Sequence, residues 1–397
     1  MAPFPPDIER LVNHVYPIAR QQMAIELASA GRRVYWFDIC LELVLLGVFY
    51  FSGAAAQLRN ALERRVRRPF VLAAIYVVLL MAGLSVALLP TTFYGSFVLA
   101  HRYGLSSESV ARWLRDWAVS AALGALIAAP VGAFFLRLIA RFRAWPAIAA
   151  LVAGPLIFFG SAVYPLWIAP LFNLFAPLPP SPLTRSILDL AKQQGLSATV
   201  VYEYDMSTQT NEADAYVAGL GKSERIAVGD TLLRGMRPDE VLYVMAHEIG
   251  HYKLGHLWRG SFEAWAGAAL AVAWIAVAGA WATRRFPGRS RTLGDPAAVP
   301  LIGVLFILFQ AATAPGANAL SRDIEHAADT FAAEHTDLGD AGVRTFARLA
   351  NQDLSVLHPS RLNVWYFYTH PPTDERILFA AHEQAAKHPQ AAGPQKR

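Results

Sequence analysis

The chain has 397 residues, of which 55% are hydrophobic and only 16% are charged. Soluble domains average about 25% charged residues, so this composition excludes an ordinary soluble protein and indicates lipid as the main solvent. The formal charge of +5 does not indicate a nucleic-acid partner, because the arginines lie mainly in short loops beside apolar segments. The single cysteine, Cys40, excludes an intrachain disulfide.

The N-terminal segment, residues 1–33, is amphipathic. Its first 22 residues lack the cationic start and apolar core of a signal peptide, so we expect no cleaved targeting segment. Six apolar segments follow, each close to the roughly 20 helical residues that cross a hydrocarbon core. They cover residues 34–53, 70–89, 117–138, 145–170, 262–283 and 297–314. The sequence therefore predicts a mainly α, polytopic membrane protein, with four transmembrane helices within 34–177 and two within 261–316.

Two polar segments, residues 178–260 and 317–386, are the expected places for water-soluble structure. In the first segment, the pattern predicts a helix at residues 181–195. It also predicts three short strands, at 198–205, 213–219 and 224–230, with a turn at 219–223 between the last two. A further helix is expected from Pro238 to His256, because proline suits a first helical turn and two acidic residues follow it. The tail, residues 387–397, is predicted to be disordered.

The sequence HEIGH, at residues 247–251, falls on that last helix. His247 and His251 are four residues apart, so their imidazoles project from one helix face and can bind one metal ion. Glu248 is close enough to reach a metal-bound water, and zinc lowers the pKa of such a water to about 7. The alternative interpretation is an ordinary helix with several histidines.

A third ligand decides between these interpretations, since catalytic zinc usually takes three protein ligands. The downstream sequence SRDIEHAAD supplies Glu325 and Asp329, again four residues apart on a predicted helix. Glu325 would bind the metal, while Asp329 would accept a hydrogen bond from a ligand imidazole. A solvated acidic face is the alternative. His326 is a chemical rival of Glu325, but on a helix it points about 100° away.

Three motifs, HEIGHYKLGH, SRDIEHAAD and YTHPPTDER, together resemble the integral-membrane zinc metalloproteases of the type-I CAAX prenyl protease family. The resemblance extends to HRYGLSSESVARWLRD, YPLWIAPLFNLFAPLP and ADAYVAGLGKSERIAVGDTLL, and covers nearly the whole chain after about Tyr35. It implies about six transmembrane helices enclosing a chamber, a small α+β gluzincin-like subdomain at one end, and one Zn²⁺ per chain.

The resemblance also implies a membrane-embedded endopeptidase that cuts near the C-terminus of prenylated proteins. Related bacterial enzymes degrade damaged membrane proteins, so a quality-control protease or chaperone-like factor without prenyl specificity is the alternative function. A transporter or structural protein with an incidental motif would bind no stoichiometric zinc. We expect a peptide or protein substrate, lipidated or membrane-bound or neither, and a bacterial cytoplasmic (inner) membrane as the location.

Carried over to this chain, the resemblance implies that the zinc ligands are His247, His251 and Glu325. It also implies Glu248 as the general base and Asp329 as the acid that orients a ligand. His370 matches a histidine that contacts the substrate or the tetrahedral oxyanion, with a purely structural role as the alternative.

The remaining matches concern substrate binding and structural support. Arg376 matches an arginine for which substrate contact and a salt bridge are both open, and Arg322 one expected to form a structural ion pair. His256 is expected to be structural. Asp214, Ala215 and Tyr216 occupy the strand that would pair with the substrate backbone, where the family commonly has Asn-Ala-Tyr. Backbone pairing survives that change, but a side-chain contact from the asparagine does not carry over.

Two further features leave alternatives open. Asp38 and Glu42 lie four residues apart in the first span, and either line the chamber or lie near the interface beside Arg32 and Arg33. The loops after the first, third and fifth spans carry twelve arginines. The positive-inside rule places those loops in the cytoplasm and the zinc site outside it, whereas eukaryotic members of the family have the opposite arrangement and an additional N-terminal span.

Overall fold

The computed structural model describes residues 4–219, 224–338 and 340–387. Most of the predicted turn at 219–223 and residues 388–397 of the predicted disordered tail lie outside these ranges. Six helical segments are long and apolar enough to cross a membrane, as the sequence predicts. They are Ile18–Phe51, Pro69–Arg102, Val110–Arg141, Trp145–Leu171, His256–Arg285 and Pro296–His335.

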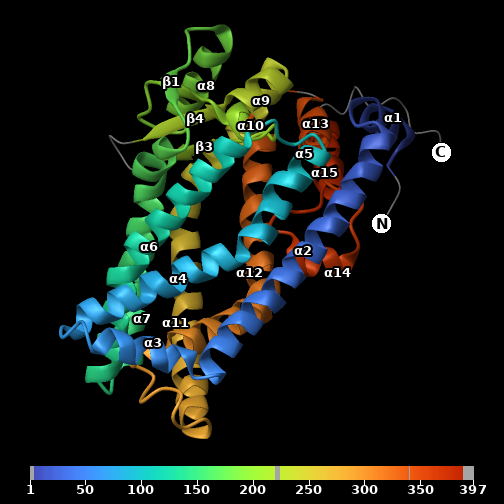
Figure 1. The fold of residues 1–397 in the computed structure, drawn as a ribbon. Coiled ribbons are helices and arrows are strands. Elements are labelled where there is room, and N and C mark those ends of the chain that lie inside the picture. Colours follow the sequence, from blue (N-terminus) through green and yellow to red (C-terminus); the bar gives the residue numbers. More distant parts are fainter. Residues whose placement is uncertain (1–3, 220–223, 339, 388–397) are drawn as a thin grey trace.

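These spans contact one another in a closed ring (Figure 1). The order around the ring is α2 (Ile18–Phe51), α4 (Pro69–Phe93), α6 (Val110–Arg141), α7 (Trp145–Val163), α11 (His256–Arg285) and α12 (Val299–His335). In a packed bundle the inward faces would be buried, yet only 6% to 28% of the apolar window of each span is buried. The spans therefore form a ring in which each helix buries little of its apolar surface against the others.

Two of the spans change their helical geometry toward one end. α4 continues into the π-helical segment η1 (Tyr94–Val98) and the short α5 (Leu99–Arg102). α7 continues into the π-helical η2 (Tyr164–Ile168) and the 3₁₀ turn η3 (Ala169–Leu171). Pro90 lies in the last turns of α4 and Pro165 within η2, so missing backbone donors account for the wider turns.

The loops after the first and fifth spans meet at the opposite end of the ring. They contain α3 (Ala54–Glu63) and the 3₁₀ turn η6 (Pro296–Ala298). Arg59 forms a buried ion pair with Asp295, and Arg291 Nη1 lies 2.6 Å from Glu63 Oε1. Some of the arginines of these loops therefore bind acidic partners within the chain.

A small α+β subdomain lies at the other end of the ring, as expected (Figure 1). Its four strands have the order β1-β2-β4-β3. They are β1 (Phe175–Pro177), β2 (Val201–Tyr204), β3 (Ala215–Ala218) and β4 (Arg225–Gly229). β2 and β4 are parallel, and the other two pairs are antiparallel. β1 was not predicted, because three residues that end in a proline give no alternating pattern. β3 is at the edge of the sheet, so one of its sides is free within the described chain.

The core of the subdomain draws on both polar segments. From the first come α8 (Pro182–Gln193), η4 (Met206–Thr208), α9 (Asp230–Gly235) and α10 (Pro238–Lys253), and from the second come α13 (Ala341–Asp353), α14 (Arg361–Phe367) and α15 (Thr373–Lys387). One continuous cluster buries Ile187, Met245, Phe346 and Ile377. The N-terminal α1 (Pro6–Val15) packs on α13.

Several predicted limits differ from the structure. α2 begins at Ile18, so residues 18–33 belong to the first span helix and not to a separate N-terminal segment. α12 runs through the limit expected at 316/317 without a break. α10 ends at Lys253 and not at His256, because Gly255 takes the left-handed conformation (φ 69°) that ends helices. α15 includes Lys387, the first residue of the predicted tail.

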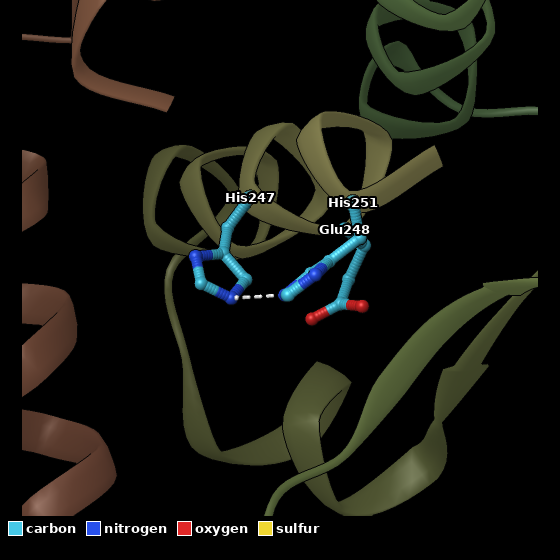
Figure 2. A group of neighbouring side chains, drawn as sticks. All are labelled: His247, Glu248 and His251. Carbon is cyan, nitrogen blue, oxygen red and sulfur yellow. Dashed lines mark hydrogen bonds between the residues drawn. The ribbon is translucent and has the colours of Figure 1, made fainter. Parts of the chain in front are cut away.

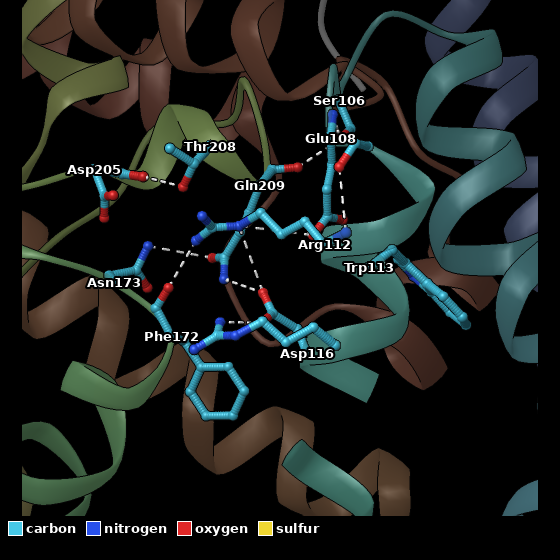
Figure 3. A network of polar contacts seen from close by, with 12 residues as sticks. Ser106, Glu108, Arg112, Trp113, Asp116, Phe172, Asn173, Asp205, Thr208 and Gln209 are labelled. Atoms are coloured by element: carbon cyan, nitrogen blue, oxygen red, sulfur yellow. Dashed lines mark hydrogen bonds and ion pairs between the residues drawn. The ribbon is translucent and has the colours of Figure 1, made fainter. Parts of the chain in front are cut away.

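A polar network fixes the sheet to the ends of the spans (Figure 3). Ser106 Oγ donates to the carbonyl of Gln209 (2.5 Å), and Gln209 Nε2 donates to Asp116 Oδ2 (3.1 Å). Arg112 Nη2 donates to the carbonyl of Phe172 (2.8 Å). Gln209 lies in the connection that leads into β3, so the sequence HRYGLSSESVARWLRD holds the start of the edge strand in place.

Candidate metal centre

The helix α10 carries the HEIGH sequence against α12. Glu240 caps its start, since the backbone N–H of Arg237 donates to Glu240 Oε2 (2.9 Å). Gly250 lets the two helices approach closely: a Cβ at this position would lie 2.9 Å from the ring of Phe331 on α12. Glycine is therefore required where the two helices bring their polar residues together.

The two histidines of HEIGH face each other (Figure 2). His247 Nε2 and His251 Nε2 are 2.9 Å apart. Glu248 extends from the same side of the helix, and ligand atoms of the three residues lie within 4.8 Å of one another. The expectation that both imidazoles project from one face is met.

α12 brings a carboxylate to these imidazoles. Glu325 Oε2 lies 3.3 Å from His247 Nε2, and Glu325 Oε1 lies 3.7 Å from His251 Nε2. Two ligands of a tetrahedral zinc at about 2.0–2.2 Å from the metal are roughly 3.3 Å apart, so the three donors are spaced to surround one ion. Glu325 Oε2 is buried and has no hydrogen bond of normal geometry to the described residues. A cation between the donors would satisfy it, so these residues fit a metal.

Asp329 lies behind the centre and supports His247. Its Oδ1 is 2.9 Å from His247 Nδ1, and the residue is 1% exposed. Arg376 binds both of its oxygens, with Nε 2.8 Å from Oδ2 and Nη2 2.6 Å from Oδ1. The guanidinium also lies over the ring of Phe346. Of the two roles left open for Arg376, this geometry favours the salt bridge over contact with substrate.

The other histidines differ in their distance from the centre. His370 Nε2 lies 3.2 Å from Glu325 Oε2 and the side chain is 55% exposed, so its ring lies at the open side of the site. His326 faces Phe379, with ring centroids 5.0 Å apart, as its helical offset from Glu325 predicts. His256 Nδ1 lies 2.9 Å from His251 Nδ1. Sequence reasoning gave His256 only a structural role and missed this contact, because the turn at Gly255 folds it back onto the ligand.

Within the described part of the chain, Arg322 binds backbone carbonyls in place of the ion pair expected of it. Its Nη1 donates to the backbone carbonyls of Val364 (3.0 Å) and Tyr368 (2.7 Å). These carbonyls lie at α14, just before the THPP sequence, so Arg322 anchors the segment that carries His370.

The environment of Glu248 changes its acidity. Burial raises the pKa of the Glu248 carboxyl, the nearby imidazoles of His247 and His251 oppose that shift, and the charges of Asp214 and Glu325 add to it. A carboxylate with a raised pKa is a stronger base at neutral pH than an exposed one.

The edge strand β3 packs against α10 beside this centre. The backbone N–H of Gly229 donates to the carbonyl of Asp214 (2.9 Å), which makes this pair hydrogen-bonded. Hydrogen-bonded and non-bonded pairs alternate in an antiparallel ladder, so Tyr216 also bonds to β4, while Ala215 and Val217 present their backbone groups at the free edge. Tyr204 Oη donates to Asp214 Oδ2 (2.6 Å).

Two pockets flank the centre along this strand. One of about 550 Å³ touches Glu248, His370 and the start of β3 at Asp214. The other, of about 560 Å³, touches His251 and the end of β3 at Val217. An extended chain along β3 would therefore pass the metal centre with room for side chains on both sides.

Comparisons with known proteins agree with this arrangement. A sequence model of a protein family, described as "Peptidase family M48", matches residues 177–384. A second family model, described as "CAAX prenyl protease N-terminal, five membrane helices", matches residues 19–174. In the second range the structure has four candidate spans.

Individual relatives cover most of the chain. It is 31% identical over 381 residues to the uncharacterized metalloprotease YhfN of Bacillus subtilis (strain 168), and the aligned region covers 93% of this chain and 87% of that protein. It is 31% identical over 303 residues to a CAAX prenyl protease 1 homolog of Arabidopsis thaliana, and this aligned region covers 73% of this chain and 68% of that protein. The crystal structure of Ste24p from S. mikatae has the same fold, with a TM-score of 0.79 at 22% identity over 94% of this chain and 93% of that one.

Proposed function

The chain belongs to peptidase family M48, and on that premise we propose that it is a zinc endopeptidase with one zinc ion per chain, held by His247, His251 and Glu325. It is a multi-pass membrane metallopeptidase that acts on peptides or proteins. The observation that carries the proposal is the convergence of three donors from α10 and α12, at separations of 2.9, 3.3 and 3.7 Å.

Zinc, when bound there, lowers the pKa of a water ligand to about 7 and polarises the scissile carbonyl. Glu248 takes the proton from the attacking water and delivers it to the leaving nitrogen. Its raised pKa suits it to hold that proton between the two steps. His370 is exposed at the open side of the site, where it can donate to the oxyanion that forms on the substrate.

Other side chains keep the ligands in position. Asp329, held by Arg376, lies 2.9 Å from His247 Nδ1. There it would take the Nδ1 proton and leave Nε2 free to bind metal. His256 does the same for His251, with its Nδ1 at 2.9 Å. These contacts fix the orientation of both imidazoles before substrate binds.

The substrate is proposed to bind in extended form along β3. The backbone groups of Ala215 and Val217 at the free edge would pair with it, as in other cases of strand addition. Asp214 accepts a hydrogen bond from Tyr204 Oη, as the side-chain oxygen of an asparagine could. We further propose that residues 178–260 and 317–386 act as one catalytic subdomain, which their shared core supports.

The proposed location is a bacterial cytoplasmic membrane, since one relative is from Bacillus subtilis, and no nucleic-acid partner is proposed. A membrane-bound substrate, prenylated or not, is proposed because a ring of spans lies beneath the site. Relatives named as CAAX prenyl proteases make a farnesylated CAAX peptide the first substrate to test.

The test is mass spectrometry of that peptide incubated with detergent-purified protein, with wild type beside Glu248→Gln. Cleavage by wild type alone would support both the mechanism and the prenylated substrate. Cleavage by both proteins would refute the role of Glu248. Absence of cleavage with one zinc bound per chain would leave the metal site in place and exclude this peptide as substrate, and unprenylated membrane-protein segments would then be tested.

A further inference from the structure

The pocket on the Glu248 side of the centre has walls of two kinds. Apolar residues of three helices form its length: Leu232, Val244, Leu349 and Ala350. Carboxylates lie where it meets the start of β3, with Asp214 and Asp353 among its lining residues. An apolar channel that ends in carboxylates matches a long side chain with a cationic tip, because the methylenes of lysine or arginine bury well while the head needs an anion.

Each of the two carboxylates accepts a hydrogen bond from an uncharged donor. Asp353 Oδ1 accepts from the backbone N–H of Ala213 (2.9 Å), and Asp214 Oδ2 accepts from Tyr204 Oη (2.6 Å). Both donors are neutral. Burial raises the pKa of Asp353 to about 7, the Ala213 N–H opposes this, and the charges of Glu212 and Asp214 raise it further. Burial also raises the pKa of Asp214, which the hydrogen bond from Tyr204 opposes. Ionisation of the two acids is therefore disfavoured until a cation binds beside them.

Among the described residues that line the pocket, no unpaired lysine or arginine balances these acids. Arg376 is the one arginine or lysine there, and it is already paired with Asp329 through Nε and Nη2. His370 lies at Glu325. The negative charge at the start of β3 is thus uncompensated by the residues that line the pocket.

A second observation marks this pocket as built for a polar occupant. Tyr243 and Thr345, 4% and 1% exposed, line its other end, and neither hydroxyl has a hydrogen-bond partner among the described residues. Thr345 and Asp353 are eight residues apart on α13, about 12 Å along the helix. An unsatisfied buried hydroxyl costs about 1–3 kcal/mol, which a second polar group of a bound peptide, separate from the group at Asp353, would relieve.

We propose that this pocket is a specificity subsite for a basic residue, lysine or arginine, of the substrate, and that Asp214 and Asp353 determine this preference. The proposal rests on the proposed function, since it concerns a residue close to the bond cut at the metal centre. The side chain enters past Glu248, its methylenes lie on α10 and α13, and its charged head lies between the two carboxylates. Asp214, which replaces the asparagine common in the family, adds the charge that an amide would lack.

The test uses quenched-fluorescence decapeptides that differ at one position, where lysine, norleucine or glutamate is placed, with that position scanned along the peptide. For wild type we expect one position near the scissile bond at which lysine raises kcat/KM about tenfold over norleucine and glutamate lowers it. Asp214→Asn and Asp353→Asn should each reduce the lysine-to-norleucine ratio several-fold. Both substitutions retain the oxygen that accepts the existing hydrogen bond, so the fold is preserved. Asp189→Asn, on the exposed face of α8, is the matched control and should leave the ratio unchanged.

Binding provides a readout that does not depend on turnover. The same peptides, labelled with fluorescein, are titrated with Glu248→Gln protein and followed by anisotropy. Tighter binding of the lysine peptide, lost when Asp214→Asn and Asp353→Asn are added, supports the subsite even if wild type cuts none of the peptides, a result that would count against the proposed function alone. Equal binding of the lysine and norleucine peptides at every position, or a lysine preference that survives both substitutions, overturns the subsite while leaving the peptidase proposal intact.

Discussion

Replacing Glu325 by alanine should remove zinc, and replacing its neighbour His326 should not. Glu325 places an oxygen 3.3 Å from His247 Nε2, while the ring of His326 lies against Phe379. Structural zinc sites with four ligands have apparent binding free energies of about 10–16 kcal/mol, so one ligand contributes about 3 kcal/mol. Glu325→Ala should therefore raise the Kd for zinc by about 100-fold or more.

The assay is competition for zinc with a chromogenic chelator of known affinity, together with elemental analysis after desalting. His326→Ala is the matched control, because it removes a side chain of comparable polarity one position away on the same helix. Size-exclusion profiles and far-UV circular dichroism would verify that both variants retain their fold. Zinc retained by Glu325→Ala and lost by His326→Ala would refute the assignment of α12 to the metal centre.

Three further predictions address groups around the metal. Asp329→Asn should weaken zinc binding by about 10–100-fold, whereas Asp323→Asn, on the exposed face of the same helix, should not; equal Kd values would refute the positioning role. Glu248→Gln should keep zinc and lose about 10²–10⁴-fold in kcat, and loss of the metal in this variant would contradict a role as base alone. The folded state raises the pKa of Asp353 to about 7 from 3.8, so it prefers the protonated acid, and ionisation costs stability progressively as pH rises from about 4 to 7. Asp353→Asn should accordingly raise the free energy of unfolding more at pH 8 than at pH 4, by at most about 4 kcal/mol, and an equal gain at both pH values in denaturant titrations would refute the raised pKa.

The membrane part of the fold could be predicted from hydropathy, but its limits could not. The six spans were found because apolar residues dominate stretches long enough to cross a bilayer. Two helices continue well beyond those stretches, from Ile18 in α2 and to His335 in α12. Their polar turns lie at the subdomain end, where α10 packs against α12, so helical structure persists after the apolar composition ends. The closure of the ring depends on which helix contacts which, and hydropathy carries no such information.

Part of the candidate site could likewise be predicted from the sequence, and part could not. His247, His251, Glu325 and Asp329 were accessible from the sequence, because spacings of four residues on two helices define two faces that can meet. Contacts made through backbone turns or between distant segments were not accessible. The approach of His256 to His251 depends on the left-handed turn at Gly255.

The acidic end of the pocket that Asp214 and Asp353 line also depends on contacts between distant segments. Asp353 reaches the Ala213 N–H across 140 positions of sequence. In the sequence, Asp353 ends an amphipathic helix and has no motif around it. Its place beside β3 follows only from how α13 crosses α10, which buries Tyr243 against Phe346. Residues that depend on such packing can be identified from the structure alone.

The metal centre and the ring of spans are built from the same helices. Glu325 and Asp329 lie on α12, which is continuous with the sixth span, and His247 and His251 lie on α10, which a single turn at Gly255 joins to α11, the fifth span. The donor separations therefore depend on the packing of α11 against α12 in the membrane. A change in that packing, whether from a bound substrate or from the surrounding lipid, would act directly on the distance between Glu325 and the two imidazoles. The site is thus mechanically part of the ring of spans, and metal binding should be sensitive to whether that ring remains closed.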